Sequence, residues 1–132
     1  LSRGASHATF VESARPALRS LRHNLEELDL VSRARVVATP VERAFSAPPW
    51  PSAAFDLVLV DPPYAAVGEA LRAADFGNIL SRGLAVAARP GCRVVVEHAS
   101  ADHAPEIPGL QIDDTRTYGD SALSFYVSSS AG

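Results

Sequence analysis

The apolar positions of this chain follow two different periods, which predict alternating strands and helices. Short apolar runs bounded by turn residues predict strands at Ala8–Val11, Ala34–Ala38, Leu57–Val60 and Arg93–Glu97. Apolar residues that recur every three or four positions predict amphipathic helices at Ala14–Leu30 and about Phe76–Ala88, with a single helical turn at Val41–Phe45. This alternation is typical of an α/β fold with a mostly parallel sheet.

The two ends of the chain carry different patterns. Leu110–Thr117 and Leu123–Val127 alternate apolar and polar residues around Tyr118-Gly-Asp120, which predicts a terminal antiparallel hairpin. At the other end, Leu1–Ala5 is interpreted as the last turn of a helix that a glycine ends.

The stretch Phe55–Tyr64 organises the rest of the chain. Four aliphatic residues, Leu57–Val60, suit a central parallel strand covered on both faces, and Asp61 ends the run. Pro62 and Pro63 fix their φ angles and lack N–H groups, so they predict a rigid turn. Asp61 and Tyr64 would then stand at the carboxyl end of a buried strand, where open α/β sheets bind ligands.

An acid, free backbone carbonyl groups and a flat ring predict a pocket for a planar group that bears an exocyclic amine. The alternative is an ordinary turn between a strand and a loop, because four residues also recur by chance. The position directly after a buried strand favours the functional interpretation.

Composition indicates a globular protein of one domain, with 132 residues, 47% hydrophobic and 20% charged. The net charge of −3 gives no overall attraction to nucleic acid, so an RNA contact would need a local patch. All twelve basic residues are arginine. Three of them, Arg15, Arg19 and Arg22, share one face of a predicted helix, where they line up for phosphate groups or, more commonly, form a solvated face.

Several site classes are not indicated. The sequence has no membrane-spanning run and no signal peptide, which predicts a cytoplasmic protein. The single cysteine, Cys92, excludes an internal disulfide and is expected to be buried. The histidines lack metal-ligand spacing; His98 is interpreted as structural, and the alternative is a group that supports a residue of the site. Methionine is absent even at position 1, so we expect further sequence upstream of Leu1.

Four stretches of the chain resemble one family. Asp61-Pro-Pro-Tyr64 resembles the Asp/Asn-Pro-Pro-Tyr/Phe motif of amino-group methyltransferases. Together with three further stretches, the chain resembles the class I S-adenosylmethionine-dependent methyltransferases and, more narrowly, the bacterial RsmD family, which methylates a guanine N2 in small-subunit ribosomal RNA. These stretches are Leu1–Ala5 leading to Phe10–Glu12, Val96–His98, and Arg116–Asp120 with Leu123–Tyr126.

The resemblance implies a set of site residues. The catalytic set would be the motif itself, Asp61, Pro62, Pro63 and Tyr64. Glu12 would accept hydrogen bonds from the ribose hydroxyl groups of S-adenosylmethionine; the alternative is an ordinary acid at a helix N-terminus.

The adenine end of the cofactor is less well matched. Where the family usually has an acid that binds the adenine amine, this chain has Pro40. The neighbouring Glu42 and the N–H group of Val41 are the expected replacements.

The resemblance also implies a fold, a Rossmann-like class I methyltransferase sheet in which residues 1–132 form a single partial domain. The family's first strand and glycine-rich loop would lie upstream of Leu1, and that strand would sit between those ending at Glu12 and Asp61. Without it two inner edges are unpaired, so we expect this chain alone either to fold poorly or to bind cofactor negligibly, and to be inactive.

The implied activity belongs to the intact protein. It is methyl transfer from S-adenosylmethionine to the N2 amine of a guanine in ribosomal RNA or a small-subunit particle, by a monomer without a metal or covalent nucleophile. The alternatives are adenine-N6 methylation of a nucleic acid, glutamine methylation, against which Asp61 argues, and a non-catalytic Rossmann-like binding module. A nicotinamide enzyme is least supported, because no Gly-x-Gly-x-x-Gly motif is present.

Overall fold

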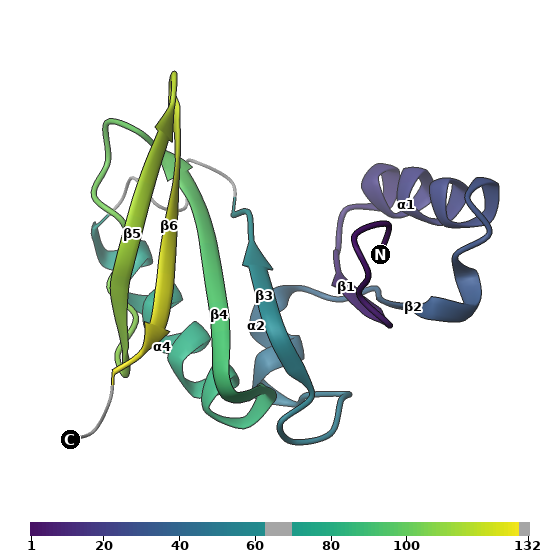
Figure 1. The fold of residues 1–132 in the computed structure, drawn as a ribbon, viewed down its shortest axis with the longest axis horizontal. Helices are drawn as coiled ribbons and strands as arrows, with labels where there is room; N and C mark the ends of the chain where they lie inside the picture. The colour runs from purple at the N-terminus through teal and green to yellow at the C-terminus, as the bar shows by residue number, and fades with distance from the viewer. Residues whose placement is uncertain (63–69, 130–132) are drawn as a thin grey trace. The chain divides into compact units, whose positions relative to one another are not determined.

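A computed structural model describes residues 1–62 and 70–129, except for the side chains of residues 70–74. The chain forms two compact units, Leu1–Pro49 and Trp50–Gly132, which are described separately here as unit 1 and unit 2 (Figure 1). No helix among the described residues is long and apolar enough to cross a membrane.

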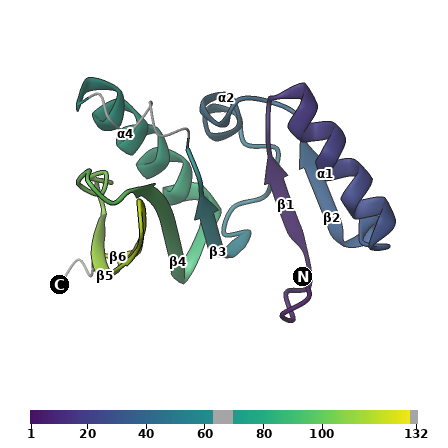
Figure 2. The ribbon, with the colours of Figure 1, turned by 90° about the horizontal axis from the view of Figure 1, so that it is seen from above.

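Unit 1 is a two-stranded parallel sheet with helices. Its elements are β1 (Ala8–Val11), α1 (Arg15–Glu27), a 3₁₀ turn (Val31–Arg33), β2 (Ala34–Val37) and α2 (Val41–Ser46). The strands pair in register from Ala8 with Ala34 to Val11 with Val37, and α1 runs beside them (Figure 2). Leu18 and Leu25 of α1 are buried.

The predicted elements of unit 1 are present, with different ends. Helix α1 stops three residues before the predicted Leu30, and Asp29 just beyond it has a φ of 54°, a left-handed conformation that does not continue a helix. The predicted helical turn at the start of the chain is a hydrogen-bonded turn, in which Gly4 donates to the carbonyl of Leu1 at 3.2 Å and has a φ of 104°.

Unit 2 is a four-stranded mixed sheet with a long helix. Its elements are β3 (Phe55–Val60), α4 (Ala70–Ala87), β4 (Ala88–Ala99), β5 (Leu110–Tyr118) and β6 (Ser121–Ser128). The strand order is β3-β4-β6-β5, in which β3 and β4 are parallel and the other two pairs are antiparallel (Figure 1). The predicted α/β class and terminal hairpin are confirmed.

The core of unit 2 lies between this sheet and α4. Alternate residues of β4 and β6 are buried on one face, where Val94 pairs with Tyr126 and Val96 with Ser124. Leu80 and Leu84 of α4 are buried as well. Cys92 is buried as predicted, and burial raises the pKa of its thiol.

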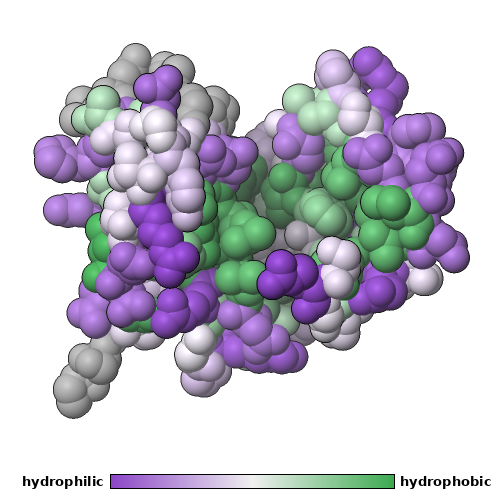
Figure 3. Space-filling model, turned by 45° about the horizontal axis from the view of Figure 1, so that its top comes forward, coloured by the Kyte–Doolittle hydropathy of each residue, from purple (hydrophilic) through white to green (hydrophobic). Residues whose placement is uncertain are grey.

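The prediction that Leu57–Val60 is covered on both faces is wrong for this structure. Strand β3 is an edge strand of its sheet, and Leu57 and Leu59 are 56% and 72% exposed. Successive side chains of a strand point to opposite faces, so Val58 and Val60 follow the buried face of β4 while the two leucines point away from it. Figure 3 shows exposed apolar surface of this kind on both units.

A chain of polar groups connects β4, β6 and β5, and two of its members, His98 and Ser124, are buried. His98 Nδ1 lies 2.9 Å from the carbonyl of Ala99, and its Nε2 lies 2.8 Å from Ser124 Oγ, which is 3.1 Å from Thr115 Oγ1. Because a carbonyl only accepts, Nδ1 carries a hydrogen and donates it. The His98 side chain is 3% exposed, and both of its ring nitrogens have hydrogen-bond partners, which fits a structural role.

The segment between β4 and β5 passes very close to α4. A Cβ atom added at Gly77 would lie 2.0 Å from the carbonyl oxygen of Glu106. Ser81, one turn further along the helix, donates from its hydroxyl to the carbonyl of Pro108 at 2.6 Å. Glycine at position 77 is therefore required for this contact.

We predict that Gly77→Ala in the full-length protein lowers the free energy of unfolding by about 1–3 kcal/mol, because a backbone carbonyl must move to make room. Alanine is a better helix former by about 1 kcal/mol, so a loss shows that the clash outweighs propensity. Urea unfolding followed by circular dichroism measures it. The control is Asn78→Ala, on an exposed position of the same helix; equal stability of the two variants would contradict the close approach.

We also predict that Ser124→Ala costs about 1–3 kcal/mol of unfolding free energy, because His98 Nε2 stays buried without a partner. Ser128→Ala, on an exposed position of the same strand, is the matched control and should change stability little. Thermal melting of both variants provides the comparison, and a Ser124→Ala protein as stable as the control would refute the role of this hydrogen bond.

Candidate functional site

The site residues of unit 2 lie where its parallel strands end. Strands β3 and β4 run in register to the pair Val60 and Val96. Asp61 comes directly after Val60, and Glu97 comes directly after Val96. The two acids therefore follow paired residues of neighbouring strands. Equivalent positions of parallel neighbours point to the same face, which brings these carboxyl groups together away from the buried face.

The two acids interact directly. Partial burial raises the pKa of Asp61 above its usual value, and the charge of Glu97 and a hydrogen bond with the Glu97 side chain raise it further. A hydrogen bond between two carboxyl groups needs a proton on one of them. Asp61 therefore holds a proton more readily than a solvated carboxyl group, and it remains exposed, whereas Glu97 is half-buried.

Only part of the predicted catalytic motif can be placed. Pro62 directly follows Asp61 and is buried, and without an N–H group it cannot extend the ladder of β3. Pro63 and Tyr64 lie outside the described residues, so their catalytic roles stay predictions.

The predicted cofactor acid of unit 1 follows β1. The N–H group of Glu12 donates to the carbonyl of Val37 at 3.1 Å, which holds its backbone against β2. Its Oε1 accepts a hydrogen bond from the N–H group of Ala14 at 3.0 Å, at the start of α1. This is the alternative role of a helix N-terminal acid. Within the described part of the chain the second carboxylate oxygen makes no hydrogen bond, so one acceptor of Glu12 remains open.

The other predicted cofactor residues begin α2. Because β1 and β2 are parallel, Glu12 and the start of α2 follow the same edge of the small sheet. The carbonyl of Pro40 accepts the N–H groups of Arg43 and Ala44, each at 3.1 Å. The N–H groups of Val41 and Glu42 precede these bonds and have no acceptor within the helix. Glu42 itself is exposed.

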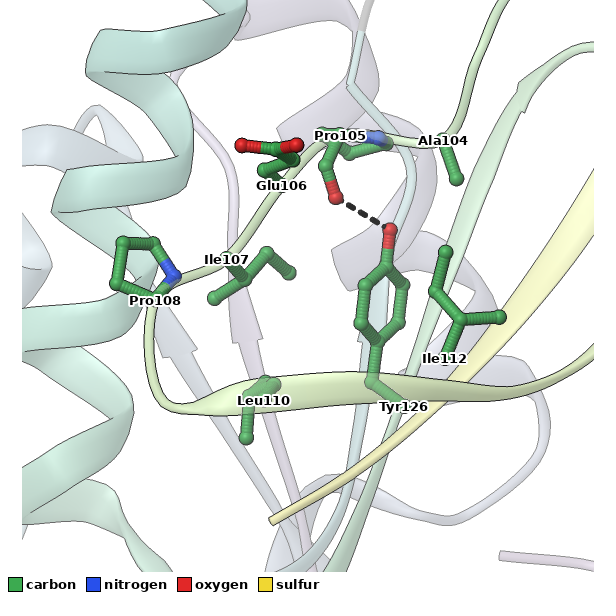
Figure 4. A pocket seen from close by; sticks show the side chains of 8 residues that line it. All are labelled: Ala104, Pro105, Glu106, Ile107, Pro108, Leu110, Ile112 and Tyr126. Atoms are coloured by element: carbon green, nitrogen blue, oxygen red, sulfur yellow. Dashed lines mark hydrogen bonds between the residues drawn. The ribbon is translucent and has the colours of Figure 1, made fainter. Parts of the chain in front are cut away.

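A pocket of about 390 Å³ lies elsewhere in unit 2, between the segment after β4 and the terminal hairpin (Figure 4). Tyr126 points into it and donates from its hydroxyl to the carbonyl of Pro105 at 2.7 Å. Burial raises the pKa of Tyr126 to about 12, so it stays neutral at physiological pH. The other lining residues are apolar except Glu106, and no predicted site residue is among them. We interpret the pocket as incomplete packing.

Within each unit the structure brings predicted residues together, Glu12 with the start of α2 in unit 1 and Asp61 with Pro62 in unit 2. Sequence reasoning missed Glu97. The sequence does contain a pattern that points to Glu97, because Asp61 and Glu97 each directly follow an aliphatic run in a predicted parallel strand. No group of histidine, cysteine or acidic side chains in the described ranges could hold a metal ion.

Comparisons with known proteins identify the family. A sequence profile of the family described as conserved hypothetical protein 95 matches residues 1–127. A curated relative, "Putative rRNA methyltransferase YlbH" of Bacillus subtilis (strain 168), is 36% identical over 64 residues, which are 48% of this chain and 35% of that protein. The match thus spans about a third of the relative's length.

Solved structures show the same fold. A conserved hypothetical protein of Streptococcus pyogenes is 28% identical with a TM-score of 0.79, over 99% of this chain and 77% of that one. "Putative methyltransferase yhhF" of Escherichia coli is 22% identical with a TM-score of 0.69, over 96% and 65% of the two chains. The fold is therefore that of a class I methyltransferase. With its family profile matched along almost its whole length, the chain belongs to the conserved hypothetical protein 95 family, the RsmD-like methyltransferases.

Proposed function

We propose that the full-length protein transfers a methyl group from S-adenosylmethionine to the exocyclic N2 amine of a guanine in small-subunit ribosomal RNA. The observation that carries this proposal is the accessible carboxyl group of Asp61. It lies at the end of the parallel strand β3, beside Glu97 and directly before the buried Pro62. Membership of a methyltransferase family supports the reaction, and the name of the Bacillus relative supports ribosomal RNA as the substrate class.

The residues of unit 1 fit the cofactor. Glu12 has one oxygen fixed by the Ala14 N–H group and a second oxygen open, so its carboxylate is held in a defined direction while it still accepts a ribose hydroxyl. The N–H group of Val41 and the side chain of Glu42 would meet the adenine. When bound, S-adenosylmethionine supplies a methyl group made electrophilic by the sulfonium.

The residues of unit 2 fit the amine. The carboxylate of Asp61 and the carbonyl group of Pro62 would accept the two N–H groups of guanine N2, which directs the nitrogen lone pair out of the ring plane. Tyr64 would stack on the base. The base must be unpaired or flipped out of its helix to be reached in this way.

The remaining expectations become part of the same proposal. The protein would act as a monomer on ribosomal RNA or a small-subunit particle in the cytoplasm, with residues 1–132 in a single methyltransferase domain. The same turn would also accept the N6 amine of adenine. Labelling of small-subunit particles, naked RNA, DNA and protein with tritiated cofactor separates these substrates.

We predict that Asp61→Ala in the full-length protein reduces transfer of tritium to small-subunit RNA by about 10²–10⁴-fold, the range that a positioned proton acceptor contributes. The control is Asp56→Ala. Asp56 lies on the same strand, exposed, in an ion pair with Arg89 at 3.1 Å, and its loss should leave labelling nearly unchanged. Normal labelling by the Asp61→Ala protein would rule out the proposed site.

We predict that Glu12→Gln weakens binding of S-adenosylmethionine by about 10–100-fold, because a hydrogen bond to a charged group contributes about 1.5–3 kcal/mol. Isothermal titration calorimetry on the full-length protein measures the affinity. Glu27→Gln, at the far end of α1, serves as the control and should bind as tightly as the unchanged protein. If the two variants bind equally well, Glu12 only caps its helix.

A further inference from the structure

Glu97 is held more rigidly than Asp61. It lies within β4, which pairs with β3 on one side and with β6 on the other, where Glu97 is opposite Leu123. Asp61, in contrast, follows the last residue of β3. The carboxyl group of Glu97 is therefore fixed beside the end of β3, where it accepts a hydrogen bond from Asp61 once Asp61 is protonated.

The other charged groups of unit 2 have different partners. Three arginines lie in strands β4 and β5, and each forms an ion pair with an acid other than Asp61 or Glu97. The ion pairs are Arg89 with Asp56 at 3.1 Å, Arg93 with Asp113 at 3.4 Å, and Arg116 with Asp114 at 3.0 Å. His98, next to Glu97 in sequence, points to the buried face and binds Ser124. Among the described residues, Glu97 is thus the charged group that acts on Asp61.

We propose that Glu97 is a positioning residue of the methyl transfer, which acts through Asp61 by holding a negative charge beside its carboxylate and so making that carboxylate a stronger proton acceptor. This inference rests on the proposed function and assigns a role to a residue outside the Asp-Pro-Pro-Tyr motif. It follows from the register of β3 and β4, which sets the two acids side by side.

The chemistry requires a proton acceptor at this place. When the amine nitrogen forms its bond to the methyl carbon, the bond between that carbon and sulfur breaks and its electron pair stays on sulfur, which becomes neutral. The nitrogen now carries the positive charge, and one of its N–H bonds must break to restore a neutral amine. Asp61 accepts that proton, and the negative charge of Glu97 beside it favours the protonated form.

The sign of the effect follows from the pKa shift. Burial and Glu97 together raise the pKa of Asp61, so removing the charge of Glu97 lowers this pKa. Asp61 must be ionised to accept a proton, and the reaction therefore gains rate as pH rises through its pKa. A lower pKa moves that rise to lower pH, and a weaker base gives a slower plateau.

The test compares Glu97→Gln with the unchanged full-length protein in single-turnover methylation of small-subunit RNA at a series of pH values. Glutamine keeps the size of the side chain but lacks the charge. We expect the acidic limb of the rate profile to move to lower pH and the plateau to fall about tenfold, part of the factor of about 10²–10⁴ from proton transfer. The control is Glu106→Gln, an exposed acid on the segment after β4.

A second measurement needs no activity. Carboxyl-carbon NMR titration should show a lower Asp61 pKa in the Glu97→Gln protein than in the unchanged one, with Asp61→Asn assigning the signal. Because relief of repulsion does not harm folding, Glu97→Gln should melt no lower than the unchanged protein.

The outcomes separate this inference from the proposed function. If the unchanged protein labels RNA and Asp61→Asn abolishes labelling, but Glu97→Gln keeps both the pH profile and the Asp61 titration, the role of Glu97 is refuted and the proposed function stands. If the unchanged protein labels no RNA, the proposed function fails and this inference fails with it. A shifted titration together with a shifted rate profile supports both.

Discussion

The parallel pairing of β3 with β4 is the constraint on which the candidate site of unit 2 depends. Parallel neighbours end at the same edge of a sheet, so the residues that follow two matched positions meet there whatever their distance in sequence. Asp61 and Glu97 are 36 residues apart and interact only because Val60 pairs with Val96. A shift of the register by one residue would turn Glu97 to the opposite face.

The buried side of β4 fixes its register against β6. Val94 and Val96 are almost completely buried opposite Tyr126 and Ser124, and His98 extends the row with a satisfied imidazole. A slip between β4 and β6 would expose these apolar groups and leave the imidazole without its partner. The polar side of the sheet is thus fixed by the packing of its apolar side.

Sequence patterns predicted much of the fold, and they singled out Asp61, Glu12 and the start of α2, whose roles in the site stay predictions. Apolar runs located the strands because burial leaves a visible signal, and a motif located Asp61. The end of α1 was misplaced because the left-handed conformation of Asp29 is not visible in an apolar repeat that continues past it. Coverage of β3 was overestimated because a run of aliphatic residues does not say how many neighbours the strand has. Glu97 was missed because strand register is a property of the folded sheet.

The net charge of the whole chain conceals a difference between its units. The first 49 residues hold seven of the twelve arginines and five acids, whereas the remainder holds five arginines and ten acids. The arginines of α1 are exposed and, among the described residues, have no acidic partner. Long-range attraction of a polyanion would therefore be concentrated in unit 1, which is consistent with the expectation that an RNA contact needs a local patch.

The open edge of β3 has a consequence for handling the protein. An edge strand offers a row of N–H and C=O groups, and here that row is accompanied by Leu57 and Leu59, with no proline or lysine between Phe55 and Val60 to discourage pairing. Strands of this kind recruit one another across molecules. Unit 2 taken alone would therefore self-associate as its concentration rises, and a covering segment on this edge is what would keep it dispersed.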